Sequence, residues 1–229
     1  MNQPVKYKKC IVVFLDILGF KKIVETEKLA PFFSDLFSAI NNLTQLGLKN
    51  MHLTDLKTAV LSDSFIASVP FKRASFNKIL RFIFVVQYML LQEGIVARGA
   101  ITIGNLYHEN NIVFGPALVN AYLLQEHNAI FPRTIIDEET LKICLGTTAS
   151  AVDCKTTYNK FKKDSDGFWF YDFIGHVITP VSYTHLDVYK RQHNTPHWKW
   201  TGQSEPIASG NFSLRLPERI CFLSAFPEP

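Results

Sequence analysis

The stretches FLDILGF, residues 14–20, and LSDSFIAS, residues 61–68, each place a carboxylate beside an apolar run. Asp16 ends the first run and Asp63 stands between two others. Continuous apolar runs of this kind are typical of strands buried on both faces. A carboxylate there is costly unless it has a partner, and two convergent carboxylates suit a pair of Mg²⁺ or Mn²⁺ ions, which take oxygen ligands. The motifs therefore predict a phosphoryl-transfer site, although Asp16 could also cap a strand end and Asp63 could be an ordinary turn residue.

The apolar pattern predicts a series of strands and helices between residues 9 and 145. The triplet Ser62-Asp63-Ser64 predicts a hairpin with Asp63 at its tip. The element order β-α-β-β-α-β is ferredoxin-like, so we expect an α+β domain with an antiparallel sheet, flanking helices, and Asp16 close to Asp63. The predicted strands are residues 9–18, 56–61, 65–69, 96–103, 112–114 and 133–136, and the predicted helices are residues 20–27, 32–46, 74–93, 116–127 and 138–145.

Composition predicts one main globular domain, since 47% of the 229 residues are hydrophobic and 19% are charged. The net charge of +4 comes from scattered basic residues, which gives no support for nucleic-acid binding. No apolar run reaches the roughly 18 residues of a membrane span. The four cysteines show neither metal-binding spacing nor a dense disulfide pattern, which favours a reducing compartment. We therefore expect a cytoplasmic protein.

Residues 180–192, PVSYTHLDVYKRQ, resemble two transposon-end sequencing adapters joined head to head and translated. Such scars are excluded from fold reasoning. The alternative is a genuine polar loop whose Tyr, His and Asp side chains only look catalytic. We expect a domain at residues 1–179, an adapter-derived artefact at 180–192 and an unrelated or chimeric tail at 193–229.

Four segments together resemble the catalytic domain of class III nucleotide cyclases. FLDILGF, LSDSFIAS, ARGAITIG (97–104) and VFGPALVNAYLLQE (113–126) occur in the order found in that family. Residues 98–122, followed by FPRTIID at 131–137, are most similar to bacterial pyrimidine cyclases, which make cyclic CMP or cyclic UMP in anti-phage signalling. The similarity extends over residues 9–172, and it implies a palm-type domain.

The resemblance implies roles for the residues around Asp16. Asp16, Asp63 and the backbone carbonyl of Ile17 would bind two Mg²⁺ or Mn²⁺ ions per site, and the turn Leu18-Gly19-Phe20 would offer N–H groups to a nucleoside triphosphate. One ion would activate the ribose 3′-hydroxyl, and the other would neutralise charge as pyrophosphate leaves. The family pattern further implies a homodimer with its sites at the interface.

Two basic residues are further candidates for binding the substrate. Arg98 opens a predicted strand, where it could face the triphosphate or merely a surface carboxylate. Lys57 shares a strand face with Ala59 and could reach the base or a phosphate, although a solvated lysine on an edge strand is the simpler interpretation.

The chain departs from purine cyclases on the helix that follows Phe114-Gly115. Those enzymes carry an Asn and, four residues later, an Arg that stabilises the transition state. A gapless alignment puts Val119 and Leu123 there, and a shift by one residue gives Asn120 and Leu124. Neither alignment supplies the cation, which can be worth about 10³-fold in rate.

The pair that reads a purine base is also absent, because Ala59 and Ile112 occupy those positions. This fits a pyrimidine cyclase acting on CTP or UTP, and it equally fits a cyclase-like domain that only binds a nucleotide or dimerises as a scaffold. A diguanylate cyclase is a weaker alternative. LDILGFKKIVE (15–25) resembles that family, but SDSF lacks its Gly-Gly-Asp/Glu-Glu-Phe signature.

Overall fold

The computed structural model describes residues 6–25, 30–45, 55–148 and 150–177. The chain divides into two units, Met1–Phe173 and Ile174–Pro229. In the second unit only residues 174–177 are described, as the end of helix α7 (Phe173–Val177). The expected adapter remnant and tail at residues 180–229 lie outside the described residues. All that follows concerns the first unit.

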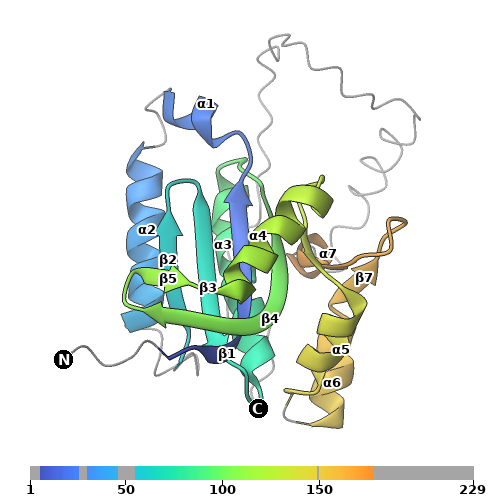
Figure 1. Ribbon diagram of the computed structural model, residues 1–229. Coiled ribbons are helices and arrows are strands. Elements are labelled where there is room, and N and C mark those ends of the chain that lie inside the picture. Colours follow the sequence, from blue (N-terminus) through green and yellow to red (C-terminus); the bar gives the residue numbers. More distant parts are fainter. Residues whose placement is uncertain (1–5, 26–29, 46–54, 149, 178–229) are drawn as a thin grey trace, which may run out of the picture. The chain divides into compact units, whose positions relative to one another are not determined.

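The first unit is built on one eight-stranded sheet (Figure 1). Its order is β2-β3-β1-β4-β6-β8-β7, and β5 pairs with β4. Every neighbouring pair is antiparallel except β4 and β6, so the sheet is mixed. The strands are β1 (Lys8–Ile17), β2 (Lys57–Leu61), β3 (Ser64–Pro70), β4 (Ala97–Glu109), β5 (Ile112–Phe114), β6 (Thr134–Ile136), β7 (Phe161–Lys163) and β8 (Trp169–Tyr171).

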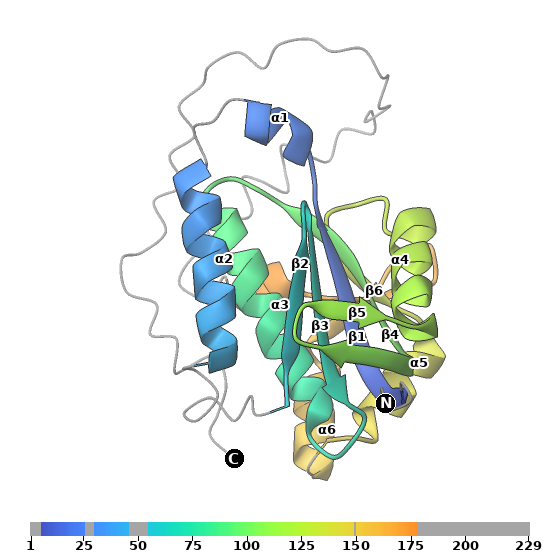
Figure 2. The ribbon, with the colours of Figure 1, turned by 60° about the vertical axis from the view of Figure 1, so that its left-hand side comes forward.

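Six helices accompany the sheet in this unit: α1 (Phe20–Glu25), α2 (Ala30–Gln45), α3 (Ser75–Gln92), α4 (Pro116–Asn128), α5 (Glu138–Leu145) and α6 (Ala151–Tyr158). Figure 2 shows α2 and α3 on one side of the sheet and α4 with β5 on the other. Along the chain the elements follow one another as β1, α1, α2, β2, β3, α3 and β4. Within the sheet, the four strands of this series lie side by side in the order β2-β3-β1-β4. The predicted α+β, ferredoxin-like arrangement is therefore confirmed.

Strand β1 separates two apolar layers because successive side chains of a strand point to opposite faces. Ile11, Val13 and Leu15 have no exposed surface. On the other face, Val12 and Phe14 pack with Ala117 and Ala121 of α4 in one core cluster. Full burial of such aliphatic or aromatic side chains stabilises the fold by about 1.5–3 kcal/mol each, which explains why β1 is the central strand.

Glycines set two of the helix boundaries. Gly94 adopts a φ of +70° directly after α3, where the expected helix ends. Gly115 adopts a φ of +141° at the start of α4, and a Cβ there would lie 2.8 Å from the carbonyl oxygen of Asn105. Pro116 then occupies the first helical position, where its missing N–H costs nothing.

Several predicted boundaries were wrong. Strand β4 continues to Glu109 instead of ending at residue 103, because its last residues pair with β5. Helix α2 begins at Ala30, so Pro31 lies in its first turn and does not break the chain before it. Elements α6, β7 and β8 were not predicted. Within the described residues, no helix has the length and apolar character needed to cross a membrane.

Candidate metal and nucleotide site

Asp16 and Asp63 meet where β1 ends. Asp16 pairs with Ser64 of β3, and the next N–H, that of Ile17, donates to the carbonyl oxygen of Asp63 at 2.9 Å. Asp63 lies in the two-residue turn that joins β2 to β3, so the predicted hairpin is confirmed. Its Oδ1 accepts a hydrogen bond from Ser64 Oγ at 3.3 Å. The sheet register therefore brings together two carboxylates that are far apart in the sequence.

Asp16 has two side-chain donors on a single oxygen. Arg98, its direct neighbour across the β1–β4 pair, donates from Nε to Oδ2 at 3.1 Å. Gln125 of α4 donates from Nε2 to the same oxygen at 3.4 Å. Arg98 Nη1 also donates to the carbonyl oxygen of Ala129, at the C-cap of α4. Arg98 thus binds a carboxylate of the candidate site itself, instead of the surface carboxylate that was the alternative to a role at the triphosphate.

The charge of Asp16 reflects burial opposed by Arg98. Burial raises the pKa of the Asp16 carboxyl above its ordinary value, the hydrogen bond and charge of Arg98 lower it, and the charge of Asp63 raises it again. Two anions whose charges act on one another are the arrangement that a divalent cation relieves.

The oxygen donors at this end of the sheet fit a hard divalent cation. No group of three or more His, Cys, Asp or Glu side chains able to hold a metal occurs among the described residues. Mg²⁺ commonly uses one or two carboxylates together with substrate phosphates, and Asp16 and Asp63 supply two carboxylates here. In the described part of the chain, Asp16 Oδ1 has no hydrogen-bond donor, which leaves one oxygen available as a ligand.

The turn after β1 has only part of the free N–H groups expected of a phosphate loop. The N–H of Leu18 donates to the carbonyl oxygen of Val96 at 3.0 Å and is therefore occupied. Gly19 adopts a φ of +74° and Phe20 begins α1, where the first N–H groups have no acceptor within the helix. The Phe20 ring packs edge-on against Phe33 of α2, with centroids 5.3 Å apart, so it anchors this turn.

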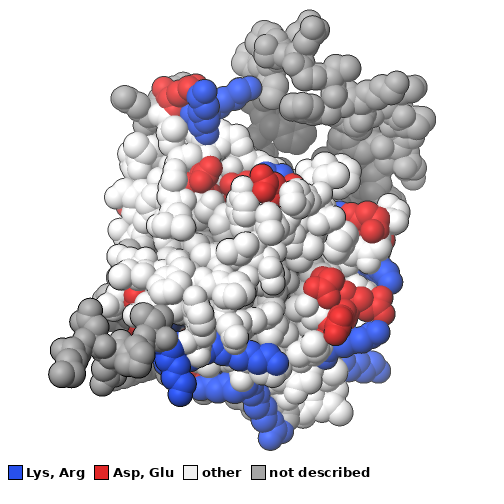
Figure 3. Space-filling view, in the orientation of Figure 1, with Lys and Arg blue, Asp and Glu red and all other residues white. Residues whose placement is uncertain are grey.

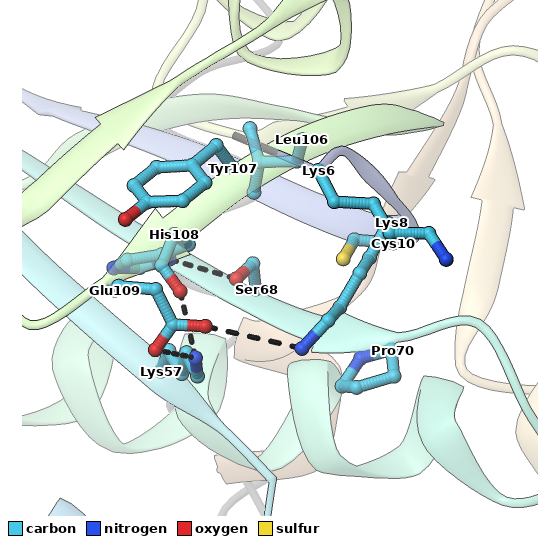
Figure 4. A pocket seen from close by; sticks show the side chains of 10 residues that line it. All are labelled: Lys6, Lys8, Cys10, Lys57, Ser68, Pro70, Leu106, Tyr107, His108 and Glu109. Atoms are coloured by element: carbon cyan, nitrogen blue, oxygen red, sulfur yellow. Dashed lines mark hydrogen bonds and ion pairs between the residues drawn. The ribbon is translucent and has the colours of Figure 1, made fainter. Parts of the chain in front are cut away.

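Lys57 lies far from Asp16 of the same chain. It pairs with Ser68 of β3, which pairs with Val12 of β1, four residues from Asp16 and so roughly 13 Å away along the strand. Its Nζ lies 2.7 Å from Glu109 Oε2 and donates to the carbonyl oxygen of His108 at 2.7 Å. Figure 4 shows these groups lining a pocket together with Ser68 and Cys10.

His108 is one of the buried titratable groups of this pocket. The residue is only 6% exposed, and its Nδ1 lies 2.8 Å from Ser68 Oγ. Burial, with a smaller effect from the charge of Lys57, lowers the pKa of His108 to about 4. The imidazole is therefore neutral at physiological pH and helps to hold the end of β4 against β3.

The contribution of Gln125 was not predicted from the sequence. The buried residues of α4 are Ala117, Ala121 and Gln125, which follow one another at intervals of four. A glutamine in an otherwise apolar stripe is the one signal that could have identified it. Gly99 and Gly104 have structural roles, because they pack closely against β1 and α4.

The surface in Figure 3 is uncharged over much of its centre, while basic residues gather along its lower edge. In this orientation α4 and β5 lie at the front of the sheet. Both elements carry exposed apolar side chains, and so does the segment after α4: Ile112, Phe114, Val119, Tyr122, Leu123, Ile130 and Phe131. Such a surface is typical of a protein–protein contact.

Comparison with known proteins supports the fold. No protein-family model matches the chain, and no curated protein matches its sequence. The catalytic core of a rhodopsin-guanylyl cyclase with converted specificity, solved with ATPalphaS, aligns with a TM-score of 0.50 and 12% identity over 72% of this chain and 96% of that one. The monomeric guanylyl cyclase domain of the RhoGC fusion protein from the aquatic fungus Blastocladiella emersonii aligns with a TM-score of 0.50 and 15% identity over 72% and 95%. The chain therefore has the fold of class III nucleotidyl cyclase catalytic domains.

Proposed function

We propose that this protein is a metal-dependent nucleotidyl cyclase that converts a nucleoside triphosphate into a 3′,5′-cyclic mononucleotide and pyrophosphate. The observation that carries the proposal is the meeting of Asp16 and Asp63 at the end of β1, joined by the hydrogen bond from Ile17 N–H to the Asp63 carbonyl. A fold shared with guanylyl cyclase cores supports it. The proposed catalytic domain comprises residues 1–179.

In this proposal the chain holds the substrate through the residues at the end of β1. Asp16, Asp63 and the carbonyl of Ile17 would hold two Mg²⁺ or Mn²⁺ ions, and the N–H groups of Gly19 and Phe20 would bind phosphate oxygens. The ions would supply Lewis-acid activation of the 3′-hydroxyl and neutralise phosphate charge. No protein nucleophile is needed, so positioning of these groups is the main contribution of the chain.

We propose CTP or UTP as the substrate and a second-messenger role in anti-phage defence for the product. The two base-reading positions lack the polar pair that reads a purine, because Ala59 is apolar and buried and Ile112 is apolar and 61% exposed. Neither side chain can hydrogen-bond a purine edge. The resemblance of residues 98–122 to pyrimidine cyclases is the basis for the defence role.

A homodimer is part of the proposal. The apolar surface of α4 and β5 would be covered by a second copy, as expected for an exposed patch of this kind. Lys57 gives a further reason, because it lies roughly 13 Å or more from Asp16 by strand register. Contact between Lys57 and a nucleotide held at Asp16 is therefore simplest if the two residues belong to different subunits.

The second candidate is a cyclase-like scaffold without turnover. It is favoured by the absence of a cation at the transition-state positions of α4. Leu123 is exposed, while Leu124 packs against a core cluster that includes Ala129 and Ile135. Neither can stabilise charge on a reacting phosphoryl group.

Mass spectrometry of reaction products separates the two candidates. The protein would be incubated with Mn²⁺ and each of the four ribonucleoside triphosphates, beside Asp16→Asn, Asp63→Asn and the matched surface control Asp153→Asn. We expect cyclic CMP or cyclic UMP from the wild type and the control, and at least a 100-fold loss in both site variants, because a metal ligand is removed. A folded wild-type protein that gives no cyclic product would favour the scaffold.

A further inference from the structure

Gln125 is a buried amide that points its donor at the candidate metal site. The residue is 2% exposed and lies on the inner stripe of α4, after Ala117 and Ala121. A buried amide without a partner is destabilising, so a polar side chain in this stripe needs a specific acceptor. Its Nε2 finds one in Asp16 Oδ2, at 3.4 Å.

The same oxygen of Asp16 is held from two separate elements. Arg98 of β4 donates to Oδ2 at 3.1 Å, and Gln125 of α4 donates to it as well. Arg98 is tied to α4 too, because its Nη1 donates to the carbonyl oxygen of Ala129 at 3.5 Å. With two donors on Oδ2, the carboxylate can no longer rotate freely about its χ2 torsion.

The other oxygen of Asp16 is left open by this arrangement. Oδ1 receives no hydrogen bond from any residue that the structure describes. A carboxylate with one oxygen fixed and one available is suited to bind a cation through that single oxygen. A bidentate geometry would require Oδ2 to give up at least one of its two donors.

We propose that Gln125 is a positioning residue which, together with Arg98, holds Oδ2 of Asp16 so that Oδ1 serves as a single-oxygen ligand for the divalent cation. The inference rests on the proposed function, since it assigns to Asp16 a metal that the cyclase reaction requires. It goes beyond that function by naming the residue on α4 that orients the ligand.

The chemistry of glutamine suits this role. An amide fixes the carboxylate without adding a positive charge, whereas a second Arg or Lys on Oδ2 would repel the incoming cation. Residues that orient metal ligands in this way are typically worth 10–100-fold in metal affinity or activity. Because Gln125 lies on the helix whose outer face is apolar and exposed, it also links the surface of α4 to the metal site.

The test is Mn²⁺ binding to the full chain without nucleotide, measured by the electron paramagnetic resonance signal of free Mn²⁺. The variants are Gln125→Leu, Gln125→Met and Asp16→Asn. The matched control is Gln87→Leu, which removes another buried glutamine, one that donates to Thr134 Oγ1 in a different part of the core. Each Mn²⁺ affinity is calculated from the concentration of folded protein, which circular dichroism measures.

We expect the Mn²⁺ dissociation constant to rise by roughly 10-fold or more in Gln125→Leu and to stay within about twofold in Gln87→Leu. Wild-type affinity in a folded Gln125→Leu or Gln125→Met variant would overturn the positioning role and leave the proposed function intact. Wild-type Mn²⁺ binding that Asp16→Asn does not change would overturn the metal pair, and with it this inference.

Nuclear magnetic resonance of the wild type tests the same contact without a substitution at Gln125. The side-chain amide protons of Gln125 should shift during a Mg²⁺ titration of the wild type and not of Asp16→Asn. An amide that stays unmoved while Mg²⁺ binds would contradict the proposal, even if both leucine and methionine variants failed to fold.

Discussion

Arg98 lies directly across the β1–β4 pair from Asp16, and its Nε donates to Asp16 Oδ2 at 3.1 Å. Both side chains are mostly buried, with exposed fractions of 27% and 19%. The cation keeps a carboxylate charged in a place where burial favours its protonated form. In the proposed metal site, Arg98 would therefore lower the pH at which the Asp16 carboxylate becomes available to a cation.

Replacing Arg98 with Met should move metal binding to higher pH. Without the hydrogen bond and charge of Arg98, the pKa of Asp16 rises further above its ordinary value, so the carboxylate accepts a proton at a pH where the wild type stays ionised. The measurement is the pH dependence of Mn²⁺ affinity, with Arg98→Lys as the charge-preserving comparison. If the pH at which Mn²⁺ affinity falls in acid is unchanged in Arg98→Met, or is lower than in the wild type, the result would contradict this role.

Placing a charge on the outer face of α4 should weaken the proposed dimer. Val119 and Leu123 are 54% and 40% exposed, and burying either against a second copy would contribute about 1–3 kcal/mol. We expect Leu123→Glu, or Val119→Glu, to raise the dimer dissociation constant by roughly 10-fold or more, measured by analytical ultracentrifugation. Val152→Glu, at a 75% exposed position on α6, is the control and should leave association unchanged. Equal association in all three variants would exclude α4 from the interface.

The stability of the protein should fall in mild acid because of His108. The pKa of this buried imidazole is lowered to about 4, so the unfolded chain binds a proton near pH 6.5 while the folded chain does not. The contribution is fully present above pH 6.5 and is lost as the pH falls towards 4, by about 2 kcal/mol at pH 5 and about 3 kcal/mol at pH 4.

Urea unfolding of the wild type and of His108→Gln at pH 7.5 and pH 5 would check this effect. Between pH 7.5 and pH 5 the wild type should lose about 2 kcal/mol more unfolding free energy than His108→Gln, because the glutamine does not titrate. A wild type that loses no more than the variant would contradict the lowered pKa of His108.

Adding one methyl group at Gly99 should disturb the register that brings Asp16 to Arg98. A Cβ at Gly99 would lie 2.5 Å from both Leu15 Cδ2 and the carbonyl oxygen of Phe14, so β1 and β4 would have to shift. We expect Gly99→Ala to lower the unfolding free energy by about 1–3 kcal/mol, measured in urea. Gly146→Ala is the control, since Gly146 already has the φ of an ordinary helical residue. Equal effects in the two variants would argue against the close β1–β4 packing.

The order of the main helices and strands could be predicted because local sequence patterns specify it. The apolar run that contains Asp16, the turn at Asp63 and the helical spacing of residues 74–93 each act over a few residues. The β7–β8 hairpin could not be predicted, because its strands gain their partners only from β6 and from each other. The length of β4 likewise depends on its pairing with β5.

By itself the sequence determined that this chain folds as an α+β domain and that Asp16 and Asp63 are its candidate metal ligands, because strand periodicity and turn chemistry are local properties. Only the tertiary structure decided which side chains donate hydrogen bonds to the carboxylate of Asp16. Arg98 reaches it through sheet register and Gln125 through the packing of α4, and neither relationship is encoded by spacing along the chain. The tertiary structure also placed Lys57 at a separate pocket, because strand β3 and four residues of register lie between it and Asp16.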